Sequence, residues 1–190
     1  MANENRVQFN LKNVHYAVLS NAGTSPAWAT PVHVPGAVTL TLDPQGEVTP
    51  FYADGVVYYQ TVSNNGYSGS LELARVPDKM LQDIWGYTLG ETSKVLTEHA
   101  DVQPAAFALL YQIDGDADNE LYVMYNCSAS RPGAGAATST ETREPQTRSF
   151  DLSAAPLPLD GVTHARTTAQ TPASTRSGWF DAVYKEGAAG

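Results

Sequence analysis

Residues 106–127, AFALLYQIDGDADNELYVMYNC, decide how the chain folds. Two apolar stretches, Ala106 to Ile113 and Leu121 to Cys127, flank an acidic segment that also contains a glycine. Apolar runs separated by turn residues predict two β-strands joined as a hairpin with an acidic tip. The spaced aspartates invite comparison with a calcium loop, but Asn119 and Tyr125 occupy the positions that such a loop gives to glycine and glutamate. We therefore expect a solvated turn and no metal site.

Alternation of apolar and polar residues predicts several further strands. These strands lie at 7–18 with a break at residues 12–13, and at 37–42, 71–73, 150–152 and 162–167. In the second of them, Val38, Leu40 and Leu42 are expected to face inward. Asp43 to Gly46 forms a turn sequence that is expected to end this strand.

One helix is predicted, from Asp78 to Trp85. Leu81, Ile84 and Trp85 repeat at helical spacing, and Gly86 follows the last of them. A single short helix cannot fill a core, so it must close the side or end of a sheet. The sequence thus predicts a mainly β chain with one flanking α-helix.

The segment 43–66 is rich in aromatic residues, with Phe51, Tyr52, Tyr58 and Tyr59 close together. The pattern leaves two interpretations open. The segment could be a strand and its loop within a core, or an extended hairpin that packs on a neighbouring subunit. Tyrosine suits a surface that is apolar on one side and wet on the other, as at an interface.

Two further segments are read from composition. Residues 128–147 are rich in Ser, Thr, Ala, Gly and Pro, which predicts a long loop. Residues 170–190 form a C-terminal arm, with a Ser- and Pro-containing linker up to residue 178 and apolar residues from Trp179 to Tyr184. We expect this arm to dock, on its own domain or on a neighbour.

Length and charge limit the possible functions. A chain of 190 residues suits a single domain, here 1–190, and only 16% of its residues are charged, against about 25% in typical soluble domains. The net charge is −9, and eleven acidic but three basic residues lie between positions 51 and 130. No basic patch is present, so tight binding of nucleic acid phosphates is not expected. A surface of this charge would repel DNA.

The sequence contains no spacing typical of a catalytic or metal site. The four histidines, at positions 15, 33, 99 and 164, form no HxxE or HxH pair, and no CxxC, GxSxG or phosphate-binding loop occurs. Cys127, the single cysteine, is expected to be a small buried side chain because the strand around it is apolar. A catalytic thiol is not expected, because no basic residue beside it would lower its pKa. We expect a protein that is not an enzyme and has no cofactor. The first residues do not form a signal peptide, and no stretch has the length of a membrane span.

Several phrases, in this order and spacing, resemble the major tail proteins (tail tube proteins) of siphophages of the phi13 type, found in phages and prophages of Gram-positive bacteria. The phrases are LKNVHYAV at 11–18, PGAV at 35–38, LDP at 42–44, TPFYAD at 49–54, NNGYSG at 64–69, YNC at 125–127, RP at 131–132, EPQT at 144–147 and WF at 179–180. The resemblance extends over nearly the whole chain, from about residue 6 to residue 185.

The resemblance implies a tail-tube fold, an antiparallel β-sandwich or barrel-like pair of sheets with a flanking helix and a long extended hairpin. It implies hexameric rings that stack into the hollow tail of a long-tailed, non-contractile phage, assembled in the host bacterial cytoplasm, through which double-stranded DNA passes without tight binding. Other copies of the chain, a tape-measure protein, a tail terminator and a distal tail protein of the same phage are the implied partners.

By this analogy the hairpin between about residues 43 and 66 stacks one ring on the next, with Phe51, Tyr52, Tyr58 and Tyr59 as contacts. A second hypothesis is that acidic residues line the lumen or the surface of the tube and keep it negative. The acids considered are Asp54, Glu72, Asp114, Asp116, Asp118 and Glu120. Two alternatives remain: a β-sandwich module that binds carbohydrate or a receptor, and a single-ring tail component such as a terminator or distal tail protein.

Overall fold

The computed structural model describes residues 7–21, 25–115, 119–138 and 145–186. The fold is mainly antiparallel β, as the sequence predicted, with strands and helices at the following bounds. The strands are β1 (Asn10–Asn21), β2 (Ala27–Trp28), β3 (Val32–His33), β4 (Ala37–Gln45), β5 (Val48–Ala53), β6 (Val56–Val62), β7 (Gly66–Leu73), β8 (Thr88–Leu89), β9 (Leu96–Thr97), β10 (Phe107–Asp114), β11 (Glu120–Ala129), β12 (Arg148–Ala154) and β13 (His164–Arg166). The helices in the described part are α1 (Asp78–Trp85) and α2 (Ala173–Ser177).

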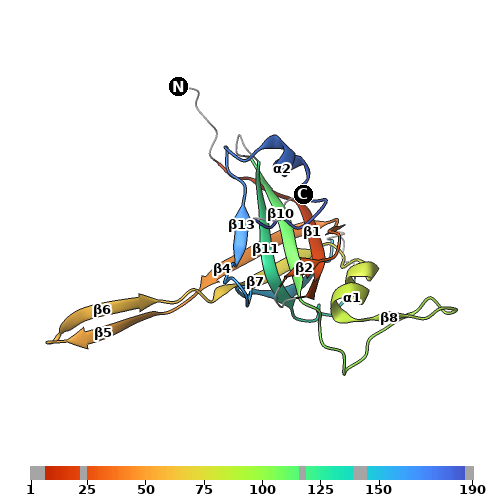
Figure 1. Cartoon of the computed structure of the whole chain (residues 1–190). Coiled ribbons are helices and arrows are strands. Elements are labelled where there is room, and N and C mark those ends of the chain that lie inside the picture. Colours follow the sequence, from red (N-terminus) through yellow and green to blue (C-terminus); the bar gives the residue numbers. More distant parts are fainter. Residues whose placement is uncertain (1–6, 22–24, 116–118, 139–144, 187–190) are drawn as a thin grey trace.

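Most strands belong to one sheet in the order β2-β1-β10-β11-β12-β7-β4, with β3 paired to β1 and β13 paired to β11. The predicted hairpin of residues 106–127 is confirmed as β10 and β11, whose ladder runs from Phe107 opposite Cys127 to Ile113 opposite Glu120. Asp116 and Asp118, at its predicted acidic tip, lie outside the described residues. One end of β11 pairs with β13 and the other with β12, and the sheet curls at this strand (Figure 1).

The main core lies inside this curled sheet. Side chains from strands on both halves of the sheet meet there, and α1 closes one side with Met80, Ile84 and Trp85. The indole of Trp85 packs edge-on against Phe150 and donates a hydrogen bond to the carbonyl oxygen of Ser130, 3.0 Å away. The predicted helix is thus confirmed at its predicted bounds. Gly86 ends it in the left-handed conformation, with a φ of 65°.

A second, smaller core lies on the outer face of β1, β10 and β11. Ala108, Leu110 and Val123 point outward from these strands and are fully buried. Trp179 of the C-terminal segment covers them, with 2% of its surface exposed. The docking that the sequence left open is therefore on the chain's own sheet, which is why β10 and β11 are apolar on both faces.

The C-terminal segment also contains α2, which the sequence did not predict. The sequence predicts that residues 173–177 belong to a Ser- and Pro-containing linker. The helix has only one turn and buries none of its side chains, so no apolar period marks it in the sequence. The expectation of a single helix is wrong for this reason.

The break predicted at residues 12–13 is a β-bulge within one continuous strand. The register of β1 against β10 shifts between Lys12 and His15, and Asn13 has a φ of 49°. An asparagine tolerates this left-handed conformation better than most residues do. The bulge bends β1 without ending it.

Strand β4 differs from its prediction in two ways. It does not end at Asp43: Pro44 still pairs with Tyr67, and the strand continues to Gln45. Because β4 is the last strand of the sheet, a proline there need not interrupt the pairing. Val38, predicted to face inward, is 50% exposed, because a bulge between Ala37 and Thr39 changes the alternation.

The predicted loop at 128–147 begins two residues later than predicted and ends where predicted, before β12 at Arg148. Strand β11 continues to Ala129, and residues 130–138 and 145–147 contain no helix or strand. Residues 139–144 lie outside the part of the chain that the structure describes.

Candidate assembly surface

The most unusual feature is the hairpin of β5 and β6, which projects from the sheet as a separate two-stranded ribbon (Figure 1). Asp54 and Gly55 form its two-residue turn, with φ values of 52° and 77°. Positive φ at both positions defines a type I′ turn, which Asp-Gly favours. The Asp-Gly dipeptide is a turn signal in the sequence, and the prediction from aromatic content did not use it.

Every residue of the two strands is exposed except Ala53, which is half-buried. A two-stranded hairpin without a covering layer is at best marginally stable in water. The exposed fractions of the four predicted aromatic contacts are 61% for Phe51, 64% for Tyr52, 73% for Tyr58 and 61% for Tyr59. The ribbon thus presents to solvent the side chains that usually stabilise a hairpin by packing.

Four valines enlarge this apolar surface beyond the predicted contacts. They are Val48, Val56, Val57 and Val62, between 48% and 73% exposed. We call these valines and the four aromatic residues the hairpin surface. So many exposed large apolar side chains on one ribbon are typical of an interaction site.

The hairpin and its base are also acidic. Between residues 43 and 66 the chain has Asp43, Glu47 and Asp54 but no lysine or arginine. Of the six acids considered for the lumen, Asp54 is the one on the hairpin, where it has the local role of forming the turn.

The other described acids of that set lie on the body of the molecule and are engaged by their own chain. Asp114 receives hydrogen bonds from Lys12 and Gln112, and the bond from Lys12 is the main reason that its pKa lies below the ordinary value. Glu72 on β7 accepts a hydrogen bond from the Thr147 hydroxyl. The structure thus does not gather these acids with Asp54 in one place.

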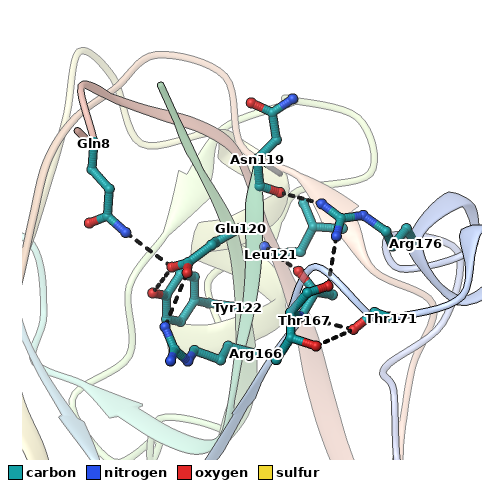
Figure 2. Close-up of polar contacts among 10 residues, drawn as sticks. Gln8, Asn119, Glu120, Leu121, Tyr122, Arg166, Thr167, Thr171 and Arg176 are labelled. Atoms are coloured by element: carbon teal, nitrogen blue, oxygen red, sulfur yellow. Dashed lines mark hydrogen bonds and ion pairs between the residues drawn. The ribbon is translucent and has the colours of Figure 1, made fainter. Parts of the chain in front are cut away.

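Glu120 is the centre of a polar network (Figure 2). Its carboxylate accepts hydrogen bonds from Gln8 at 3.0 Å, from the Tyr122 hydroxyl at 2.5 Å and from Arg166 at 3.1 Å. Burial and the bond to Glu120 raise the pKa of Tyr122. Arg176 of α2 donates to the carbonyl oxygen of Asn119, so the network ties the start of the chain, β11, β13 and the C-terminal segment together.

The sheet offers open edges for contact with other chains. Within the described residues, β4 pairs with β7 alone, and β13 pairs with β11 alone. Beside β4, a groove of about 310 Å³ separates it from the beginning of β1. The groove is lined by Leu40 and Leu42 of β4, by Gln8, Phe9, Asn10 and Leu11, and by Tyr111 and Ile113.

The single thiol is structural in character. Cys127 is 1% exposed, and burial raises its pKa to about 12. A thiol that stays protonated is a poor nucleophile and a poor metal ligand. Among the residues that the structure describes, no group of three or more His, Cys, Asp or Glu side chains could hold a metal ion. None of the described helices is long and apolar enough to cross a membrane.

Comparison with known proteins gives a distant structural likeness. No family model matches the sequence, and no curated protein matches it. Among solved structures, the cryo-EM structure of the anti-feeding prophage cap, a tube-terminating cap, aligns over 89% of this chain and 98% of its own, with a TM-score of 0.47 and 9% sequence identity. At this distance the likeness carries neither a family nor a function over to the present chain.

Proposed function

We propose that this chain is a structural subunit of a phage tail and not an enzyme, and that its rings stack into the tail tube of a long-tailed, non-contractile phage. The observation that carries the proposal is the β5–β6 hairpin, with eight large apolar side chains on a ribbon that its own domain does not cover. Burying such a surface against another copy removes apolar area from water, at roughly 25 cal/mol per Å².

The open strand edges support the same assembly. An exposed edge is an aggregation hazard in a monomer, and a closed ring of subunits removes one by placing an edge such as that of β13 against the next copy. Contacts between rings differ from contacts within a ring because they do not close on themselves. The hairpin of one copy meets a different surface on the next copy, and such head-to-tail contacts produce open-ended filaments.

The finer parts of the proposal come from the sequence resemblance. Each ring has six subunits, a tape-measure protein sets the length, and a terminator and a distal tail protein close the two ends. The tail is assembled in the host cytoplasm, and DNA passes through a lumen kept negative by acidic side chains. Asp114 and Glu120 each pair with a cationic side chain of their own chain, which offsets their negative charge. The acids at 43, 47 and 54 form no ion pair within the described residues, so they would contribute more to a negative lumen.

Negative-stain electron microscopy of the purified protein at rising concentration tests the proposal. We expect six-fold rings and hollow tubes of constant width. Single rings that never stack would instead support a terminator or distal tail protein. Monomers that bind a glycan array would support the alternative of a carbohydrate-binding β-sandwich.

A further inference from the structure

The hairpin is a direct continuation of the edge of the sheet. Strand β4 leads into β5, and β6 leads back into β7, so that β4 and β5 run along one line (Figure 1). Backbone hydrogen bonds bridge the junction, from Ser63 N to Glu47 O at 3.0 Å and from Asn65 N to Gln45 O at 2.8 Å. The hairpin therefore projects along the direction of the edge strand.

The outer edges of β5 and β6 differ in the backbone N–H groups that they can offer to another strand. In an antiparallel ladder, hydrogen-bonded pairs alternate with pairs whose N–H and C=O groups point outward. Ser63 donates to Glu47, so the next pair, Val48 opposite Val62, points outward, as does Pro50 opposite Gln60. Pro50 has no N–H, and its ring lies on the outer edge of β5, where a proline blocks strand pairing. The outer edge of β6 has no proline.

The direction of the strands also favours β6 over β5. If hairpins connect rings whose subunits all have the same polarity, the hairpin of one copy lies beside the sheet of the next with its direction unchanged. Its β5 then runs parallel to β4 of the next copy, and its β6 runs antiparallel to it. Antiparallel pairing is slightly more stable per residue, so both direction and proline placement favour β6.

The groove beside the receiving edge is apolar. Strand β4 has no partner on its far side within the described residues, and the groove between β4 and β1 is lined mainly by apolar side chains such as Leu40, Leu42 and Leu11. Val57 and Val62 stand opposite Tyr52 and Val48, on one face of the ribbon, and could enter this groove when the strands pair.

We infer that β6 (Val56–Val62) of one copy pairs antiparallel with the open edge of β4 in a copy of the next ring, and that the hairpin thereby extends the neighbour's sheet. The inference rests on the proposed stacking of rings. It adds which strand is used, which edge receives it, and that main-chain hydrogen bonds join the rings. Strand addition of this kind combines main-chain bonds with side-chain pockets.

Two proline variants test the inference. Val62 and Val48 face each other in one outward-pointing pair, so V62P and V48P each remove one outward N–H and one exposed valine without breaking a β5–β6 hydrogen bond. We expect V62P to abolish tubes, or to raise the concentration needed for them at least tenfold, and V48P to form tubes as the unchanged chain does. Both substituted positions are exposed and lie outside the core, so circular dichroism and gel filtration should show the same folded subunit.

The other outcomes separate the inference from the proposed function. Normal tubes from V62P, or equal loss of tubes in both variants, would overturn the assignment to β6 and leave ring stacking intact. If the unchanged chain forms no tubes under any condition, the stacking proposal fails and the inference fails with it. Hydrogen exchange of assembled tubes gives a second readout: peptides covering 37–45 should become protected on stacking, and their unchanged exchange would also overturn the inference.

Discussion

The ring of Phe180 stacks on the imidazole of His15, with 4.6 Å between ring centroids and an angle of 25° between ring planes. His15 lies on β1, and Phe180 follows the buried Trp179 in the C-terminal segment. The contact joins two parts of the chain that are far apart in sequence. It makes the docking of the C-terminal segment sensitive to the charge of one histidine.

That sensitivity predicts a pH dependence. Burial lowers the pKa of His15 below its usual value of about 6.5. A smaller contribution in the same direction comes from His33, whose ring lies 4.9 Å away on β3, and the carbonyl oxygen of Asn13 acts in the opposite direction. No acidic side chain is among the groups that perturb His15.

The direction of the change in stability with pH follows from proton binding at His15. Between the two pKa values the unfolded chain binds more protons at His15 than the folded chain does. The contribution of His15 to stability is therefore complete above about pH 6.5 and is lost as the pH falls through the lower, folded-state pKa. Thermal unfolding between pH 8 and pH 5 should show this loss, and H15Q should show a flatter profile. An identical profile in H15Q would exclude His15 as the cause.

Trp179 is predicted to stabilise the subunit. It is 2% exposed, covers the outer core, and its indole donates a hydrogen bond to the carbonyl oxygen of Tyr122 at 3.3 Å. Truncation of a buried tryptophan to alanine costs about 3–5 kcal/mol. W179A should lower the free energy of unfolding by that amount in urea titrations. As a control, L159S changes a side chain that is 55% exposed and should alter stability little.

The paired substitution of Tyr58 and Tyr59 by serine should separate assembly from folding. Both side chains are more than 60% exposed, so their loss removes no core contact. We expect a subunit with unchanged melting temperature that forms no tubes. Normal tubes from this variant in electron micrographs would rule out the hairpin surface as the contact between rings.

The turn residue Gly55 offers a more subtle test. A Cβ at this position would meet no atom within 4 Å, but its φ of 77° is unfavourable for any side chain. Because a left-handed conformation costs an L-residue about 1–2 kcal/mol, G55A should destabilise the hairpin without affecting the body. Faster hydrogen exchange limited to peptides of 48–62 is the expected result. G133A provides the matched control. Gly133, like Gly55, has open space around it, but its φ does not lie in the left-handed region.

The prediction from sequence was accurate where the structure depends on neighbouring residues. The β10–β11 hairpin and α1 follow from apolar spacing and turn residues, which act over a few positions. In the same way, Cys127 was expected to be buried because its strand is apolar, and it is. The aromatic residues at 51, 52, 58 and 59 were identified as a group from composition alone.

Tertiary structure decided everything that depends on distant partners. Strand β4 runs through Asp43 and Pro44 because β7 pairs with it, and local turn propensity is weaker than an available ladder. The C-terminal segment docks on its own sheet because Trp179 finds the outer face of β10 and β11. The sequence by itself determined a mainly β chain with an aromatic segment at 43–66 and a helix at 78–85. Only the fold decided that this segment continues an open sheet edge, because long-range pairing leaves no mark in the local order of residues.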